Sequence, residues 1–79
     1  MTIHLEYFAS LREQRGLANE TIATTDPDAR ALYASLRERH GFSLSAEHLR
    51  VAVNDDFCDW DRPLSDGDRV VFLPPVAGG

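Results

Sequence analysis

The clearest structural signal in this 79-residue sequence is a single amphipathic helix over residues 26–41. Asp26 can accept hydrogen bonds at a helix N-cap, and Pro27 fits the first helical position, where no backbone amide is needed. Apolar residues then recur at spacings of three and four until Gly41, a residue type typical of helix ends. These apolar positions are Ala29, Leu32, Tyr33 and Leu36. A helix with one apolar stripe must pack against another element, and a chain this short forms one small domain.

Segments with β-strand character lie on both sides of this helix. The expected strands cover residues 3–8, 20–25, 50–54 and 68–73, with a turn at 54–56 that leads into a short partner segment at Phe57-Cys58. The first of them alternates apolar and polar residues, so Ile3, Leu5 and Tyr7 are predicted to face the core. Ser10 and Glu13 have the spacing of a capping box, which predicts a short helix that ends at Gly16.

This order of elements predicts an α+β fold of the β-grasp kind. In that fold a mixed sheet of four to five strands carries one main helix on one face, and the first and last strands are neighbours at its centre. Val70 and Phe72 of the last strand are then expected to face the core. Val71, Leu73 and Phe8 are expected to form an apolar patch on the outward face. An apolar patch of this kind is typical of a partner-binding surface.

The charge of the chain excludes some classes of function. The net charge is −5, and all eight basic residues are arginine. Proteins that bind nucleic acid are normally basic, so neither a nucleic acid nor an anionic membrane is an expected partner. No apolar run is long enough for a membrane span or a signal peptide, and the single cysteine permits no internal disulfide. We therefore expect a cytoplasmic protein.

Several residues with chemical potential fit structural roles better than catalytic ones. Cys58 lies among aspartates that disfavour a thiolate, so we interpret it as an inert strand residue. The three histidines lack metal-ligand spacing, and the acidic stretch 55–68 lacks the calcium-loop pattern, so no metal site is predicted. His40 is expected to interact favourably with the C-terminal end of its helix. Trp60 fits either the body of the domain or a partner surface.

The last six residues carry no charged or aromatic side chain. They are Pro74, Pro75, Val76, Ala77, Gly78 and Gly79. The prolines favour an extended chain that projects up to about 20 Å, and the two glycines make an end thin enough for a narrow channel. A terminal carboxylate is a poor electrophile, but an acyl-adenylate formed with ATP reacts with a persulfide and leaves a thiocarboxylate. We therefore expect a domain over residues 1–73 and an extended, flexible tail over residues 74–79.

The sequence also resembles a known family. Residues 66–79, which end in Pro-Pro-Val-Ala-Gly-Gly, are similar to the C-terminal signature of the small subunits of molybdopterin synthase, which are ubiquitin-like sulfur carriers. Residues 7–13 resemble the N-terminal block of that family, and Val53-Asn54 its middle strand. This sequence departs from the family pattern at two positions. Leu73 stands where an aromatic residue is common in the family, and Arg69 stands where an acidic residue is frequent.

The resemblance implies a function in molybdenum cofactor biosynthesis. Gly79 would be adenylated by an ATP-dependent activating enzyme and thiocarboxylated with sulfur from a persulfide-forming sulfurtransferase. Residues 74–78 would then insert with it into the large synthase subunit, within a heterotetramer, and donate sulfur to cyclic pyranopterin monophosphate to form the dithiolene. The chain itself would be a non-catalytic sulfur donor without a bound cofactor, because the catalytic groups belong to the large subunit. By position, Phe8, Arg12 and Leu73 match residues that meet that subunit.

Two other functions stay open. A sulfur carrier for thiamine thiazole synthesis would use the same glycine with a different acceptor, although Pro-Pro-Val before the last residues favours the molybdopterin branch. A ubiquitin-like modifier or adaptor would be joined to other proteins through Gly79 or would act by binding alone. The absence of lysine excludes chains built through its own side chains.

Overall fold

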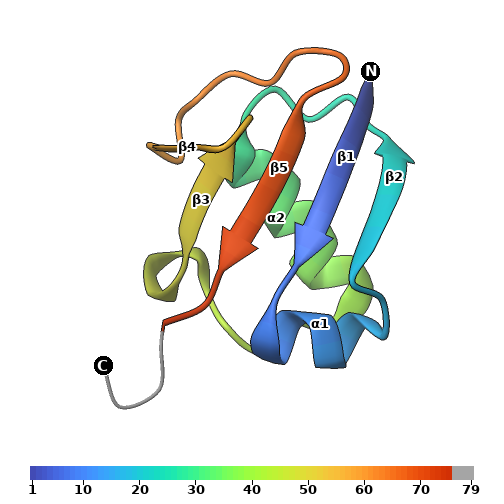
Figure 1. The fold of residues 1–79 in the computed structure, drawn as a ribbon, viewed down its shortest axis with the longest axis vertical. Coiled ribbons are helices and arrows are strands. Elements are labelled where there is room, and N and C mark those ends of the chain that lie inside the picture. Colours follow the sequence, from blue (N-terminus) through green and yellow to red (C-terminus); the bar gives the residue numbers. More distant parts are fainter. Residues whose placement is uncertain (76–79) are drawn as a thin grey trace.

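The computed structural model of the protein describes residues 1–75. Within this range the chain forms five strands, two α-helices and one short 3-10 helix, η1 (Figure 1). In chain order they are β1 (Thr2–Tyr7), α1 (Ala9–Arg15), β2 (Asn19–Ala23), α2 (Ala29–His40), η1 (Ala46–His48), β3 (Arg50–Val53), β4 (Asp56–Cys58) and β5 (Arg69–Leu73). In that part of the chain, no helix is long and apolar enough to cross a membrane.

The five strands form one mixed sheet in the order β2-β1-β5-β3-β4. The central strands β1 and β5 run parallel, with Leu5 opposite Val70 and Tyr7 opposite Phe72. The other neighbouring strands are antiparallel. The predicted α+β fold, with the first and last strands adjacent at the centre, is confirmed, and α2 packs across one face of the sheet (Figure 1).

The core lies between the sheet and α2. Every apolar residue predicted to face the core from β1, α2 and β5 is almost completely buried. These residues are Ile3, Leu5, Tyr7, Ala29, Leu32, Tyr33, Leu36, Val70 and Phe72. Trp60 packs against the same cluster, with its ring stacked on that of Phe72 at a centroid distance of 5.9 Å. Trp60 therefore belongs to the body of the domain.

The predicted start of α2 is wrong by two residues. Asp28, not Asp26, is the N-cap, and its carboxylate accepts a hydrogen bond of 2.8 Å from the amide of Ala31. Pro27 stays outside the helix because its carbonyl accepts a hydrogen bond from the amide of Leu64, so this segment pairs with the loop after β4. The carboxylate of Asp26 instead accepts a hydrogen bond from the hydroxyl of Thr24.

The predicted capping box of α1 is also wrong. The helix begins at Ala9, so Ser10 lies inside it, and the N-cap is Phe8, which makes no side-chain capping bond. The carbonyl of Phe8 accepts from the amides of Leu11 and Arg12, because the chain turns into α1 directly after β1. The predicted end is confirmed, since Gly16 adopts a left-handed conformation at φ +80°.

The hairpin of β3 and β4 turns at residues 54–55, within the predicted turn at 54–56, and Asp56 already belongs to β4. Asn54 and Asp55 both have positive φ, the geometry of a turn that matches the twist of paired strands. This turn fixes the register, with Val53 opposite Asp56 and Ala52 opposite Phe57. The last strand begins at Arg69, one residue later than predicted.

Candidate functional site

The tail leaves the domain from the centre of the sheet. Strand β5 ends at Leu73, after which Pro74 is half-buried and Pro75 is exposed. Because β1 and β5 run parallel, this exit lies at the same end of the sheet as α1 (Figure 1). The predicted tail residues Val76, Ala77, Gly78 and Gly79 lie outside the described residues, so their predicted roles and the domain boundary at residue 73 stay predictions.

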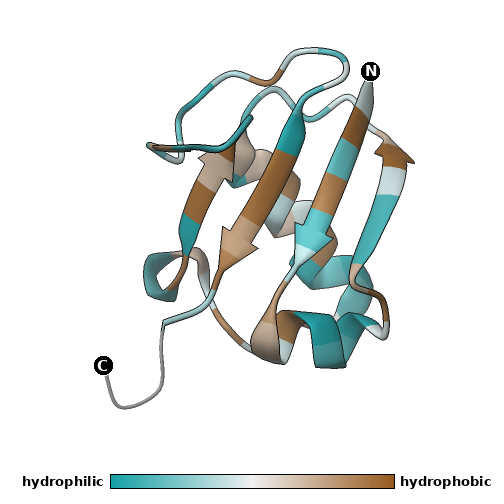
Figure 2. Cartoon of the chain, viewed as in Figure 1, coloured by the Kyte–Doolittle hydropathy of each residue, from teal (hydrophilic) through white to brown (hydrophobic). Residues whose placement is uncertain are grey.

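The face of the sheet opposite α2 carries apolar residues beside this exit. β1 alternates in hydropathy along its length, whereas β5 is apolar over most of its length (Figure 2). Val70 and Phe72 of β5 are buried under α2, while Val71 and Leu73 are half-buried on the other face. Val71 lies between Glu6 of β1 and Ala52 of β3 in the sheet. The outward direction predicted for Val71 and Leu73 is therefore confirmed.

A shallow apolar groove of about 530 Å³ runs along this face to the tail exit. Its lining residues are Glu47, His48, Leu49, Arg50, Phe57, Leu73, Pro74 and Pro75. Phe57 is 55% exposed and is the most exposed large apolar side chain of the described residues. We call Phe57, Val71, Leu73, Pro74 and Pro75 the open-face patch.

The sequence analysis did not identify Phe57 as a functional residue. The available signal was the two-residue turn at residues 54–55, which sets Phe57 opposite Ala52. Because neighbouring side chains of a strand alternate between faces, Phe57 then shares a face with Ala52 and Val71 and not with the buried Val51 and Val53. The register therefore places the exposed Phe57 ring on the face of the sheet opposite α2.

The two other predicted partner residues lie on the segment that follows β1. Phe8 is 42% exposed and comes directly after Tyr7, the sheet partner of Phe72, so it lies beside the Leu73 end of β5. Arg12 is exposed on α1 and lines a separate depression with Glu13 and other residues of that helix region. The register thus places Phe8 near the Leu73 end of the open-face patch, while neither Phe8 nor Arg12 lines the groove.

A partly buried polar cluster connects α1 to the sheet. Arg15 of α1 donates two hydrogen bonds to the carboxylate of Glu20 in β2, at 2.8 and 2.9 Å, and the hydroxyl of Tyr7 donates a third at 2.8 Å. The bonds from Arg15 are the main reason that the pKa of Glu20 lies below its usual range. Burial, and then Glu20, raise the pKa of Tyr7 well above its usual range. The cluster therefore favours an ionised Glu20 and a neutral Tyr7.

The environment of His40 differs from the prediction. His40 is the last residue of α2, but burial and then the nearby Arg15 lower its pKa from the usual 6.5. A lowered pKa means that the structure disfavours the protonated ring. The predicted place of His40 at the end of its helix is confirmed, whereas partial burial and the nearby Arg15 make the charged form of its ring less favourable there.

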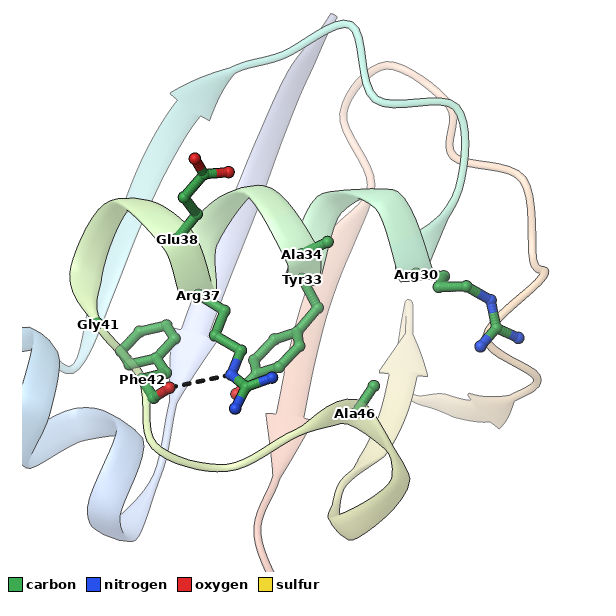
Figure 3. Close-up of a pocket in the computed structure, with 8 residues that line it drawn as sticks. All are labelled: Arg30, Tyr33, Ala34, Arg37, Glu38, Gly41, Phe42 and Ala46. Carbon is green, nitrogen blue, oxygen red and sulfur yellow. Dashed lines mark hydrogen bonds between the residues drawn. The ribbon is translucent and has the colours of Figure 1, made fainter.

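A second pocket, of about 460 Å³, lies on the helix side of the domain between α2 and the loop that follows it (Figure 3). Three of its polar side chains, those of Arg30, Tyr33 and Arg37, have structural partners. Arg37 donates from Nε to the carbonyl of Phe42 at 3.1 Å and from Nη2 to that of Ser43 at 3.4 Å. The hydroxyl of Tyr33 donates to the carbonyl of Leu44 at 2.6 Å. These contacts close the loop on α2 and form no convergent ligand site.

Metal binding and thiol chemistry find little support in the described residues. Within residues 1–75, no group of three or more histidine, cysteine, aspartate or glutamate side chains could hold a metal ion. Cys58 is half-buried in β4, with its sulfur 3.9 Å from the carbonyl oxygen of Val51. The titratable side chains that line the groove at the tail exit are the exposed Glu47, His48 and Arg50.

The described residues form a β-grasp domain in which the central strand β5 leads into Pro74 and Pro75 at an apolar groove. Comparison with known proteins shows that the chain belongs to the ThiS family, because the model of that family matches residues 5–79. The similarity stated from the sequence is thus confirmed at the level of the family.

Individual relatives cover nearly the whole chain. A curated relative from Escherichia coli (strain K12), named molybdopterin synthase sulfur carrier subunit, is 38% identical over 98% of this chain and 99% of its own length. A solved complex of subunits 1 and 2 of the molybdopterin-converting factor from Helicobacter pylori contains a chain with a TM-score of 0.70 and 31% identity, and all of both chains is covered. Small archaeal modifier protein 1 of Haloferax volcanii, at a TM-score of 0.79 and 19% identity over 95% of this chain and 98% of its own, shows only a shared fold.

Proposed function

We propose that this chain is the sulfur carrier subunit of a molybdopterin synthase. The observation that carries the proposal is the 38% identity to the Escherichia coli sulfur carrier subunit over almost the full length of both chains. The structure adds physical support, because the central strand β5 leads straight into Pro74 and Pro75 beside an apolar patch. A carrier of this kind needs a rigid body, a thin projecting end and a surface for its partners.

In the proposed cycle the chemistry takes place at the carboxylate of Gly79. An activating enzyme that binds ATP converts the carboxylate to an acyl-adenylate and releases pyrophosphate. The terminal sulfur of a sulfurtransferase persulfide then attacks the acyl-adenylate and displaces AMP, which forms an acyl disulfide between the two proteins. A second thiol of the sulfur donor cleaves this S–S bond, so that the sulfur donor is left as a disulfide and Gly79 as a thiocarboxylate. We expect no resident cofactor on this chain, and we expect the cycle to run in the cytoplasm, where a lone thiol such as Cys58 stays reduced.

The charged tail then donates its sulfur to cyclic pyranopterin monophosphate in the large synthase subunit. We propose that the open-face patch and Phe8 dock on that subunit while residues 74–79 enter it, with one carrier at each end of a dimer of large subunits. The Helicobacter pylori complex of subunits 1 and 2 supports a partner of this kind, since one of its chains shares this fold at 31% identity. The catalytic groups of the synthase are expected on the large subunit.

The experiment that tests the activation step is intact-mass spectrometry of the full chain. The protein is incubated with the activating enzyme, ATP and a sulfur donor, and we expect a mass gain equal to one sulfur in place of one oxygen. A variant that lacks Gly79 should show no gain. An uncharged wild-type chain, under conditions that charge the Escherichia coli relative, would contradict the proposal.

A second step separates the two sulfur-carrier pathways. The thiocarboxylated protein is mixed with the large subunit and the pterin precursor, and we expect the dithiolene product and the return of the carboxylate mass. A chain with one residue added after Gly79 is the matched control, since it should melt at the same temperature but accept no sulfur. Efficient charging without transfer to the pterin would favour the thiamine branch, and covalent attachment to other proteins would favour a modifier.

A further inference from the structure

Arg50 has an unusual place on the docking face. Its guanidinium carbon lies 3.9 Å from the centroid of the Phe57 ring, and its cross-strand neighbour in β5 is Leu73. Both neighbours belong to the open-face patch, and all three residues line the groove that leads to the tail exit. An exposed cation therefore lies over an aromatic ring of the apolar groove.

The ion pairs of the described residues leave Arg50 without a carboxylate. Arg15, Arg30 and Arg69 each pair with an acidic side chain at 2.6 to 2.9 Å, whereas no such pair involves Arg50 within residues 1–75. Glu47 lines the same groove, but its carboxylate accepts a hydrogen bond from Ser45 and lies 3.7 Å from the ring of His48. Arg12, Arg37, Arg39 and Arg62 also form no ion pair within residues 1–75, but of these unpaired arginines only Arg50 lines the groove.

Docking of the open-face patch would remove Arg50 from water. The stacking on Phe57 holds the guanidinium over the ring, so a partner that covers Phe57 also covers Arg50. An arginine buried without an acceptor is strongly unfavourable, while a carboxylate meets its planar donors with two parallel hydrogen bonds. A partner that binds this patch tightly must therefore present a carboxylate next to its apolar contact.

We propose that Arg50 is a specificity residue that binds a carboxylate of the large synthase subunit. This inference rests on the proposed function and adds to it the chemistry of the partner surface: an apolar patch that covers Phe57, with an aspartate or glutamate at its edge opposite Arg50. A partner without that acidic group is rejected, because it leaves the guanidinium desolvated and unpaired. The other reading is that Arg50 only shields the Phe57 ring from water, and the two readings predict opposite results.

The test is the affinity of the full chain for its large subunit, measured by surface plasmon resonance at two salt concentrations. We expect Arg50→Leu to weaken binding by about 10- to 100-fold, mainly through faster dissociation, and to reduce its salt dependence. Arg50→Lys keeps the charge but loses the planar donors, so its loss should be intermediate. Arg50→Glu should weaken binding more than Arg50→Leu.

Arg39 offers a matched control. It is exposed on α2, lines a different depression with Met1 and Ala23, and forms no ion pair within the described residues. Arg39→Leu and Arg39→Glu cause the same changes in net charge, and we expect less than a twofold change in affinity. Circular dichroism spectra and melting curves of all variants should match the wild type, because both arginines are exposed.

The outcomes separate this inference from the proposed function. Arg50→Leu that binds as tightly as the wild type, or more tightly, would overturn the specificity role and support the shielding role while the proposed function stands. A wild-type chain that does not bind the large subunit would contradict the proposed function itself. In the positive case, Arg50→Glu should be rescued by an aspartate or glutamate of the large subunit changed to arginine. Failure of every exposed acidic position to rescue it would contradict a direct carboxylate contact.

Discussion

The two faces of the central sheet are built from the same strands but differ in burial. On one face, Val70 and Phe72 of β5 are completely buried under α2. On the other face of the same strand, Val71 and Leu73 stay half-exposed next to the open Phe57. Both faces are apolar at this point, so hydrophobicity alone does not distinguish them. The difference is that the chain supplies a cover for one face and leaves the other for a partner.

This contrast separates folding from binding within a single strand. Apolar area covered by α2 stabilises the domain in the free state, whereas apolar area on the open face gives its free energy only when a partner covers it. Substitutions on the covered face should therefore change the free energy of unfolding. Substitutions on the open face should change the affinity for the large subunit.

The largest effect is expected for Phe72→Ala. Phe72 is completely buried, and its ring lies 5.0 Å from that of Tyr33. We expect the free energy of unfolding to fall by about 3–5 kcal/mol, because the change removes buried area and leaves a cavity. Urea denaturation followed by circular dichroism measures this, with Leu73→Ala as the control from the open face, for which we expect less than about 1 kcal/mol. An equal loss of unfolding free energy in Phe72→Ala and Leu73→Ala would contradict the distinction between the covered and the open face.

The next effect concerns Phe57→Ala on the open face. We expect the dissociation constant for the large subunit to rise by roughly 10- to 100-fold, because a central aromatic side chain is a typical binding hot spot. Its free energy of unfolding should change by less than about 0.5 kcal/mol, since the ring is 55% exposed. Phe57→Leu keeps an apolar contact and should lose less affinity. If Phe57→Ala lowers the free energy of unfolding but binds the large subunit as the wild type does, the ring stabilises the domain and does not contribute to binding.

A smaller effect is expected for Glu20→Gln at the polar margin of the covered face. The neutral amide cannot accept the paired bonds of Arg15 together with the bond from Tyr7 as the carboxylate does. We expect a loss of about 1–2 kcal/mol in the free energy of unfolding. The control is Glu13→Gln on the exposed side of α1, with a change below about 0.5 kcal/mol. An unchanged Glu20→Gln would mean that the cluster does not hold α1.

The smallest effect is the pH dependence due to His40. Its pKa in the folded state lies below the usual 6.5, so the unfolded chain binds the proton more strongly. The contribution of His40 is fully present above pH 6.5 and is lost as the pH falls below that value. We expect the melting temperature to decrease from pH 7.5 to pH 5.5, and the decrease to be smaller in His40→Gln.

The carboxylate of Glu20 extends this acid sensitivity to lower pH. Its folded-state pKa lies below the usual 4.5, so its stabilising contribution is present above that value and is lost as the pH falls through the folded-state pKa. The wild type should therefore lose stability in two successive ranges on acidification, with only the lower one absent in Glu20→Gln. A melting temperature that rises on acidification in the first range would contradict the lowered pKa of His40.

Much of the fold follows from local patterns in the sequence. Alternation places Ile3, Leu5 and Tyr7 in the core, and the spacing of three and four places Leu32 and Leu36 on the buried side of α2. These predictions are confirmed because burial follows directly from the repeat of a strand or helix. The start of α2 was less predictable, because the carbonyl of Pro27 accepts a hydrogen bond from the amide of the distant Leu64. Such contacts depend on which segments the fold brings together.

The candidate site divides in the same way. The sequence by itself determined the order of strands and helices, the buried face of each and the residues of the Gly-Gly tail, because each of these depends on local spacing and residue type. Only the tertiary structure decided that Phe57 and Arg50 lie beside Leu73 and Pro74 at the tail exit, and that His40 is desolvated beside Arg15. The physical reason is that sheet register and the field of neighbouring charges arise between segments far apart in the chain.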